Sequence, residues 1–166
     1  MGESVLNHRP SPNEPDTDIK SNARVANGLT GVLADSFVLM IKTQAYHWNV
    51  VGPLFVPIHT LTEEQYTDLF GAIDVIAERI RALGHVAPMS FADLSGQASL
   101  TEETATRSAG EMVAQLVSDH EAVVRRLREL AAAAADLGDG ATEDLANGRM
   151  AFHEKAIWML AAIIAE

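Results

Sequence analysis

The chain contains no cysteine, so a disulfide framework, a thiolate metal site and a cysteine nucleophile are all excluded. A reducing compartment agrees with this absence. The chain has no cationic start followed by an apolar run, and no stretch of about 18 consecutive apolar residues. We therefore expect a cytoplasmic protein without a secretion signal or a membrane span.

Basic residues are scarce: there are 12 Lys and Arg against 23 Asp and Glu, which gives a formal net charge of −11. Nucleic-acid binding depends on clustered cations that neutralise phosphates. The charge therefore argues against an unaided nucleic-acid binder and favours cationic ligands. A Gly-rich phosphate loop, a Gly-x-Ser-x-Gly elbow and a dinucleotide fingerprint are also missing.

The chain has 166 residues, of which 48% are hydrophobic, enough for one domain with a substantial core. Its first twenty residues are polar and include Pro10, Pro12 and Pro15. This composition predicts a flexible tail over 1–20 and one folded domain over 21–166.

Apolar residues recur at helical spacing in four long segments, and no segment alternates like a strand. The predicted helices cover about 22–49, 57–83, 101–135 and 142–165. The third would start near Thr101, where Ser99 and Glu102 have capping-box spacing. The connection 85–100 is long, with a short helical turn expected near 91–94. Together these features predict an all-α, ferritin-like four-helix bundle with one long crossover between its second and third long helices.

Four potential metal ligands lie on one face of the second helix: His59, Glu63, Asp74 and Glu78. At 100° per residue they lie at roughly 0°, 40°, 60° and 100° around the axis, and Tyr66 and Phe70 fall between them. A solvated face would explain the charges, but interleaved aromatics are more typical of a buried interface.

The two ligand pairs are too far apart for one site on one helix. They are 15 residues apart, about 22 Å along the axis. Two copies of the helix packed antiparallel about a twofold axis near Tyr66 and Phe70 would bring the pairs together and make two equivalent sites. His47, at the end of the first helix, can join them. Two imidazoles and three carboxylates suit iron, manganese or zinc.

Two other di-iron arrangements are excluded. No histidine has a Glu three residues before it, as the ferritin-type Glu-x-x-His motif requires. No two histidines lie four residues apart, which argues against a hemerythrin-like oxygen carrier. His120 lies on an apolar stripe, which indicates a structural role.

The string QAYHWNVVGPLFVPIHTLTEEQY, followed by DVIAERIRALG, resembles the Dps family, the bacterial mini-ferritins. The resemblance is strongest over about 42–84, and it does not cover the tail before Ser21. It implies a hollow dodecamer that oxidises Fe(II), typically with hydrogen peroxide, and stores the ferric product, protecting against oxidative stress. By position it implies a ferroxidase centre between subunits, holding iron as a di-iron or mono-iron site, with the ligands His47, His59, Glu63, Asp74 and Glu78.

Three further expectations follow from the resemblance. Glu63 stands where the family usually has Asp, which can change the geometry or the metal occupancy. Trp48 would lie beside the site and intercept radicals or electrons, with plain packing an equally good explanation. Acids near the start of the last helix would line threefold pores for iron entry. The candidates are Asp139, Glu143, Asp144 and Glu154, although the helix dipole explains the first three equally well.

Some members of the family instead protect DNA by binding it through Lys-rich tails. Here the first twenty residues carry Arg9 and Lys20 against Glu3, Glu14, Asp16 and Asp18. The arginines of the third helix, at 125, 126 and 128, are expected to pair with acids. The nucleoid-binding alternative is therefore weaker than the ferroxidase.

Overall fold

The computed structural model describes residues 9–13, 15–19 and 22–165. Over these residues the chain forms five helices and no strand: α1 (Asn22–Asn49), α2 (Phe55–Ala82), α3 (Phe91–Gln97), α4 (Ala109–Leu137) and α5 (Gly140–Ile163). The predicted all-α fold, with a short helix in the long connection, is confirmed.

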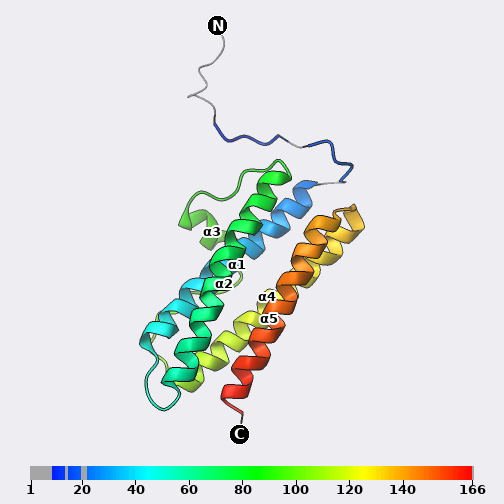
Figure 1. Ribbon diagram of the computed structural model, residues 1–166. Coiled ribbons are helices and arrows are strands. Elements are labelled where there is room, and N and C mark those ends of the chain that lie inside the picture. Colours follow the sequence, from blue (N-terminus) through cyan, green and yellow to red (C-terminus); the bar gives the residue numbers. More distant parts are fainter. Residues whose placement is uncertain (1–8, 14, 20–21, 166) are drawn as a thin grey trace.

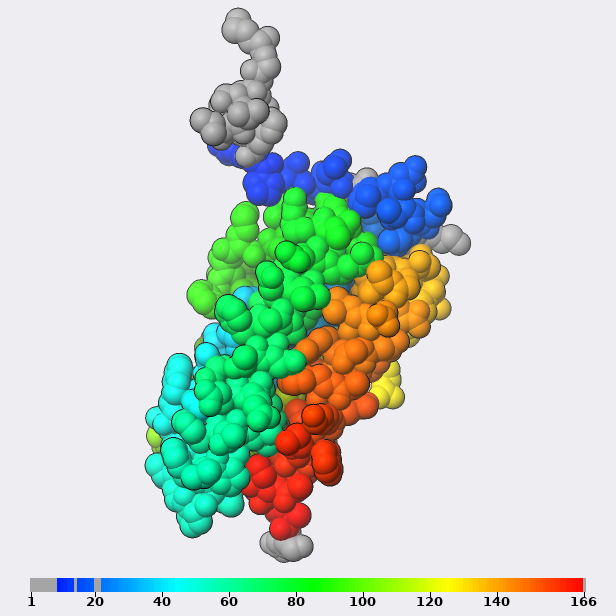
Figure 2. Space-filling view, viewed as in Figure 1, coloured from blue at the N-terminus to red at the C-terminus, as the bar shows by residue number. Residues whose placement is uncertain are grey.

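The four long helices form two hairpins that pack together (Figure 1). α1 packs mainly against α2 and α4 mainly against α5, while α1 also contacts α4 and α2 contacts α5. The segment between α2 and α4 returns along the bundle and packs α3 against α1. Figure 2 shows α2 and α5 side by side on one face of the molecule. This is the ferritin-like arrangement with one long crossover.

Apolar stripes from all four long helices make the core. The fully buried side chains come from each of them and include Leu29, Leu69, Ile76, Leu116 and Leu160. These positions recur at three- and four-residue spacing, which gives each helix one apolar face.

Two ion pairs, one fully and one partly buried, join α1 to α4. Lys42 Nζ lies 2.6 Å from Asp119 Oδ2, with both side chains nearly inaccessible. Arg126 Nη1 lies 2.7 Å from Asp35 Oδ2, and Asp35 is completely buried. Because a buried charge without its partner is strongly destabilising, these pairs fix how α1 and α4 align.

The predicted start of the third long helix near Thr101 is wrong, because α4 begins at Ala109. Ser99 does not cap a helix: its backbone N–H and hydroxyl donate to Asp35, 2.6 and 2.8 Å away. The capping box is instead made by Ser108 and Glu111. The sequence contained both Ser-x-x-Glu pairs, and the tertiary contact with Asp35 decided between them.

The other boundaries differ less from the prediction. α1 spans 22–49, as the sequence predicts. α2 begins at Phe55, two residues before Pro57, which a first turn tolerates because its N–H groups have no intrahelical partner. α5 runs from Gly140 rather than Thr142, and ends at Ile163.

The predicted flexible tail over 1–20 lies partly outside the described residues, which omit 1–8, 14 and 20. Within the described part, the Asn13 N–H donates to the Gly84 carbonyl at 2.7 Å. Ile19 packs against the core. The last part of the segment therefore lies against the bundle.

Among the described helices, α1 is long and apolar enough to cross a membrane by length and composition. However, 61% of its most apolar window is buried inside the bundle. A core helix of a folded domain accounts for this composition.

Candidate metal centre

The end of α1 lies against the start of α2, and this brings His47 and His59 together. Their rings stack with centroids 3.7 Å apart and planes 15° from parallel. His47 Nδ1 lies 2.8 Å from the His59 carbonyl oxygen, and His59 Nδ1 lies 2.9 Å from the His47 carbonyl oxygen. The two histidines thus hold each other through reciprocal bonds to backbone oxygens.

These bonds determine which ring nitrogen can bind a metal. A carbonyl oxygen only accepts, so each Nδ1 must carry the hydrogen and donate it. In a neutral ring the lone pair is then on Nε2. Metal-binding histidines typically donate their second nitrogen to a carbonyl or carboxylate, which orients the ring. His47 and His59 are thus arranged as Nε2 ligands.

Three further side chains contact the histidine pair: Tyr66, which the sequence placed on the ligand face of this helix, and Phe55 and Thr62, which it did not single out. Phe55 stacks on the outer face of His59 at 4.9 Å, and Tyr66 meets His47 edge-on at 5.2 Å. Thr62 Oγ1 lies 3.4 Å from His47 Nδ1. Phe55, Thr62 and Tyr66 lie four residues before, three after and seven after His59, which places them near it on the helix. Which of them face His47 depends on how α1 meets α2.

The residue before His47 fixes the end of α1 to the crossover. Tyr46 is 2% exposed, and its hydroxyl donates to Glu103 Oε2 at 2.6 Å. Burial and this bond raise the pKa of Tyr46. Bonds from Tyr46 and Arg107 lower the pKa of the Glu103 carboxyl to about 2. An ionised Glu103 therefore anchors Tyr46, and with it the backbone that bears His47.

The carboxylates of the predicted site point away from the core. Glu63, Asp74 and Glu78 are all exposed on α2. Phe70, midway along the same helix, is 71% exposed. Over the described residues, no three His, Asp or Glu side chains lie close enough together to hold a metal ion. One chain therefore brings His47 and His59 together but leaves Asp74 and Glu78 apart from them.

Trp48 follows His47 and is 68% exposed. Packing inside a single chain does not account for this ring. Aromatic residues, tryptophan among them, are enriched in contact surfaces between chains.

The four candidate pore acids have different surroundings. Asp139 is 1% exposed and caps α5: it accepts from the Thr142 N–H at 2.9 Å and pairs with Arg79 at 2.6 Å. Its carboxylate is thus buried and bonded to groups of its own chain. Glu143 is half-buried and Asp144 exposed. Glu154 is exposed and lies 3.4 Å from Arg128.

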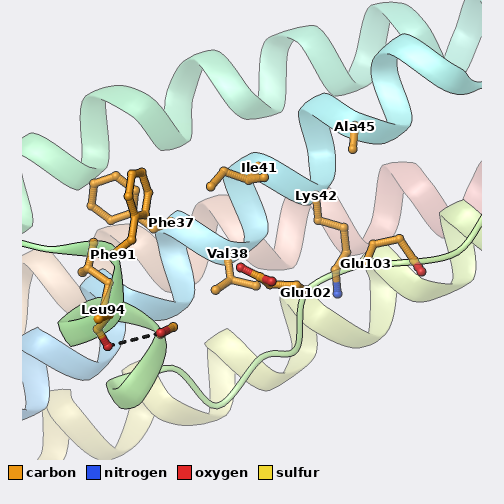
Figure 3. A pocket seen from close by; sticks show the side chains of 11 residues that line it. Phe37, Val38, Ile41, Lys42, Ala45, Phe91, Leu94, Glu102 and Glu103 are labelled. Atoms are coloured by element: carbon orange, nitrogen blue, oxygen red, sulfur yellow. Dashed lines mark hydrogen bonds between the residues drawn. The ribbon is translucent and has the colours of Figure 1, made fainter.

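A hollow of about 470 Å³ lies between α1, α3 and the segment that follows α3 (Figure 3). Its walls are mainly apolar, with Phe37, Ile41 and Phe91 among them. Its buried ammonium, Lys42, is already paired with Asp119. Of the two carboxylates in its wall, Glu103 is bonded to Tyr46 and Arg107 and Glu102 is exposed. The histidine pair, with its rings held in place, is the better candidate for chemistry.

Comparisons with known proteins find relatives over most of this chain. A family model described as a ferritin-like domain matches residues 26–166. An uncharacterized low temperature-induced protein of Nostoc sp. is 44% identical over 142 residues, covering 84% of this chain and 79% of the relative. The DNA protection during starvation protein of Brevibacillus brevis is 37% identical over 140 residues, covering 84% of this chain and 94% of the relative. The chain belongs to the Dps family.

A solved Dps structure supports the membership at the level of the fold. The Vibrio cholerae protein superimposes with a TM-score of 0.83 at 32% identity, covering 87% of this chain and 91% of that one. It is described as a member of a broad superfamily of ferritin-like diiron-carboxylate proteins. The sequence-based identification as a Dps protein is therefore confirmed, and the superfamily suggests iron binding.

Proposed function

We propose that this Dps protein is a ferroxidase and iron store. In this proposal it oxidises Fe(II) at a site shared by two chains and keeps the ferric product inside a hollow shell of twelve chains. The observation that carries the proposal is the reciprocal bonding of His47 and His59, which leaves both Nε2 atoms free to bind a metal. Dps membership and the diiron-carboxylate superfamily support iron as the metal.

The ligand set is completed by a second chain. His47, His59 and Glu63 of one chain would face Asp74 and Glu78 of another, packed antiparallel about a twofold axis. The exposure of all three carboxylates in the single chain agrees with this, because each is free to meet a partner. Glu63 in place of the usual Asp adds a methylene, which affects how closely its carboxylate approaches the iron.

The protein's groups then act on Fe(II) as a substrate. Carboxylates stabilise the higher charge of Fe(III) more than that of Fe(II), so they favour loss of an electron. One hydrogen peroxide accepts two electrons from two Fe(II) ions and, with two protons, leaves as two waters. Both Fenton reactants are consumed in this step, which protects the cell against oxidative stress.

The negative charge of the protein attracts Fe(II) toward the shell. A shell of twelve chains carries a formal charge of −132, twelve times −11, and attracts cations. Glu143, Asp144 and Glu154 are the candidates for lining an entry pore. Asp139 is better explained as the cap of α5, because its carboxylate is buried and bonded.

The proposal is tested by stopped-flow oxidation of Fe(II) with peroxide and with oxygen, alongside the native mass. We expect a twelve-chain mass and fast oxidation by peroxide. Replacing His59 by Ala should slow oxidation by about 100-fold, because losing a residue that only orients a metal ligand already lowers metal affinity or activity by about 10- to 100-fold. Wild-type oxidation no faster than that of Fe(II) in buffer would contradict the proposal.

The names of several relatives raise DNA protection as a second function. We predict that this chain does not retard duplex DNA at about 0.15 M salt, where the Debye length is about 8 Å. Its net charge is −11, and Arg125 and Arg128 pair with Glu121 and Glu154. The gel-shift titration is run with a chelator, because divalent cations bridge like charges. Sub-micromolar, salt-sensitive retardation would favour the DNA-binding function instead.

A further inference from the structure

Two histidines that are not among the candidate metal ligands meet inside the bundle. His120 on α4 is 0% exposed and His153 on α5 is 1% exposed. Their Nδ1 atoms lie 2.8 Å apart. Two Nδ1 atoms can form a hydrogen bond only if one carries a hydrogen and the other does not. The contact therefore requires at least one neutral ring.

The contact lies in a polar layer of the core. On the antiparallel neighbours α2 and α5, Asp68 pairs with Arg149 at 2.6 Å. His153 lies one turn after Arg149 on α5. Because α2 runs in the opposite direction, the residue at the same level on α2 lies one turn before Asp68, and this residue is Gln65. Gln65 also shares a small hollow with Phe152, the residue before His153. α2 thus adds a buried amide at the level of the histidine pair.

Several polar atoms in this layer have no hydrogen-bond partner among the described residues. They are the amide Nε2 and Oε1 of Gln65, Nε2 of His120 and Nη2 of Arg149. No acceptor among the described residues lies within hydrogen-bond distance of His120 Nε2, so an extra proton there would be left unpaired. Buried N–H groups without an acceptor are costly, so the layer resists protonation.

The charges around the pair also oppose protonation. Arg149 lies close enough to disfavour the charged form of both rings. Its partner Asp68 neutralises it only in part, because Asp68 is 42% exposed at the edge of the layer. Burial is the larger cause: it lowers the pKa of His120 to about 3, and it lowers the pKa of His153 well below the ordinary value.

The nearby carboxylates do not compensate. Asp119, next to His120, forms an ion pair with Lys42 of α1 and accepts a hydrogen bond from Gln115. On α5, the exposed Glu154 pairs with Arg128.

We propose that the His120–His153 contact is an acid-sensitive lock between α4 and α5. At neutral pH the two uncharged rings hold the hairpin closed. In acid, the rings take up protons only when the contact breaks and water enters, so acidification opens the bundle at this layer. The proposal concerns the chain's own stability and does not depend on iron binding.

The direction follows from linkage. A histidine with a lowered pKa in the folded chain contributes stability that is present above about pH 6.5, its unfolded value, and is lost as the pH falls toward its folded value. Over that range each such ring raises the equilibrium constant for opening about tenfold per pH unit, and two rings raise it about a hundredfold.

The test compares the wild-type chain with H120L/H153L, in which two apolar side chains of similar volume replace the pair. Circular dichroism and hydrogen exchange of α4 and α5 are followed from pH 7.5 to pH 3.5. We expect the pH dependence of opening in the wild type to become steeper below about pH 6.5. The variant should open at a lower pH, with up to two fewer protons taken up per chain. H85Q, which replaces a half-buried histidine just after α2, should open like the wild type.

The proposal would be overturned if H120L/H153L opened at the same pH as the wild type and with the same steepness of opening against pH. A second measurement does not depend on the variant folding. In the wild type, ¹⁵N shifts of the two rings should stay those of neutral imidazoles until exchange protection in α4 and α5 is lost. A ring that becomes charged while that protection remains would also overturn it.

Discussion

Mixing H59A chains with D74A chains under reassembly conditions will restore about a quarter of the wild-type ferroxidase sites, although each variant alone has none. The reason is the 15-residue separation between the two ligand pairs on α2. In a mixed dimer, one site combines both defects and the other combines His59 of one chain with Asp74 of the other. Half of randomly formed dimers are mixed, and each has one intact site of two.

The measurement is the initial rate of Fe(II) oxidation by peroxide after reassembly of equal amounts of the two variants. Reassembled wild type gives the reference rate, and each variant reassembled alone gives the background. A matched mixture of H59A with H47A is the decisive control. His47 and His59 contact each other within one chain, so neither chain can supply an intact half-site. Equal rates in both mixtures would mean that the site is not shared as proposed.

Much of the fold was accessible from the sequence because local signals and tertiary contacts agreed. The bounds of α1 and the short helix near 91–94 follow from periodicity and breakers. The start of α4 did not, because two capping boxes compete and the choice depends on Asp35, more than sixty residues away. Side-chain contacts over such distances leave no periodic pattern.

Some features of the candidate site could likewise be predicted from local spacing, and others depend on how the helices pack. The candidate ligand pairs on α2 share a face by helical geometry alone, so spacing was enough to propose them. The tautomers of His47 and His59 depend on two backbone carbonyls that face each other only after α1 and α2 pack. Asp139 looked like a pore acid by position, and only its bonds to Arg79 and Thr142 revealed a structural role.

Replacing Phe70 by Glu will prevent the twofold dimer and, with it, assembly of the shell and rapid oxidation of Fe(II). Phe70 is 71% exposed in the single chain and lies between the ligand pairs, near the expected axis. A twofold axis places the two new carboxylates close together, without cations to pair them. Burying such charges costs about 4 kcal/mol or more, close to a thousandfold in the dimer dissociation constant.

The expected result is a monomeric native mass with unchanged helix content, because an exposed position on α2 contributes little to the fold of one chain. F70L, which keeps an apolar side chain, should assemble and oxidise Fe(II) like the wild type. A132E adds the same charge at an exposed position on α4 and controls for net charge. An F70E protein with the wild-type mass and oxidation rate would place the twofold contact elsewhere on the chain. Loss of assembly in F70E alone would instead locate the shared site at this face of α2.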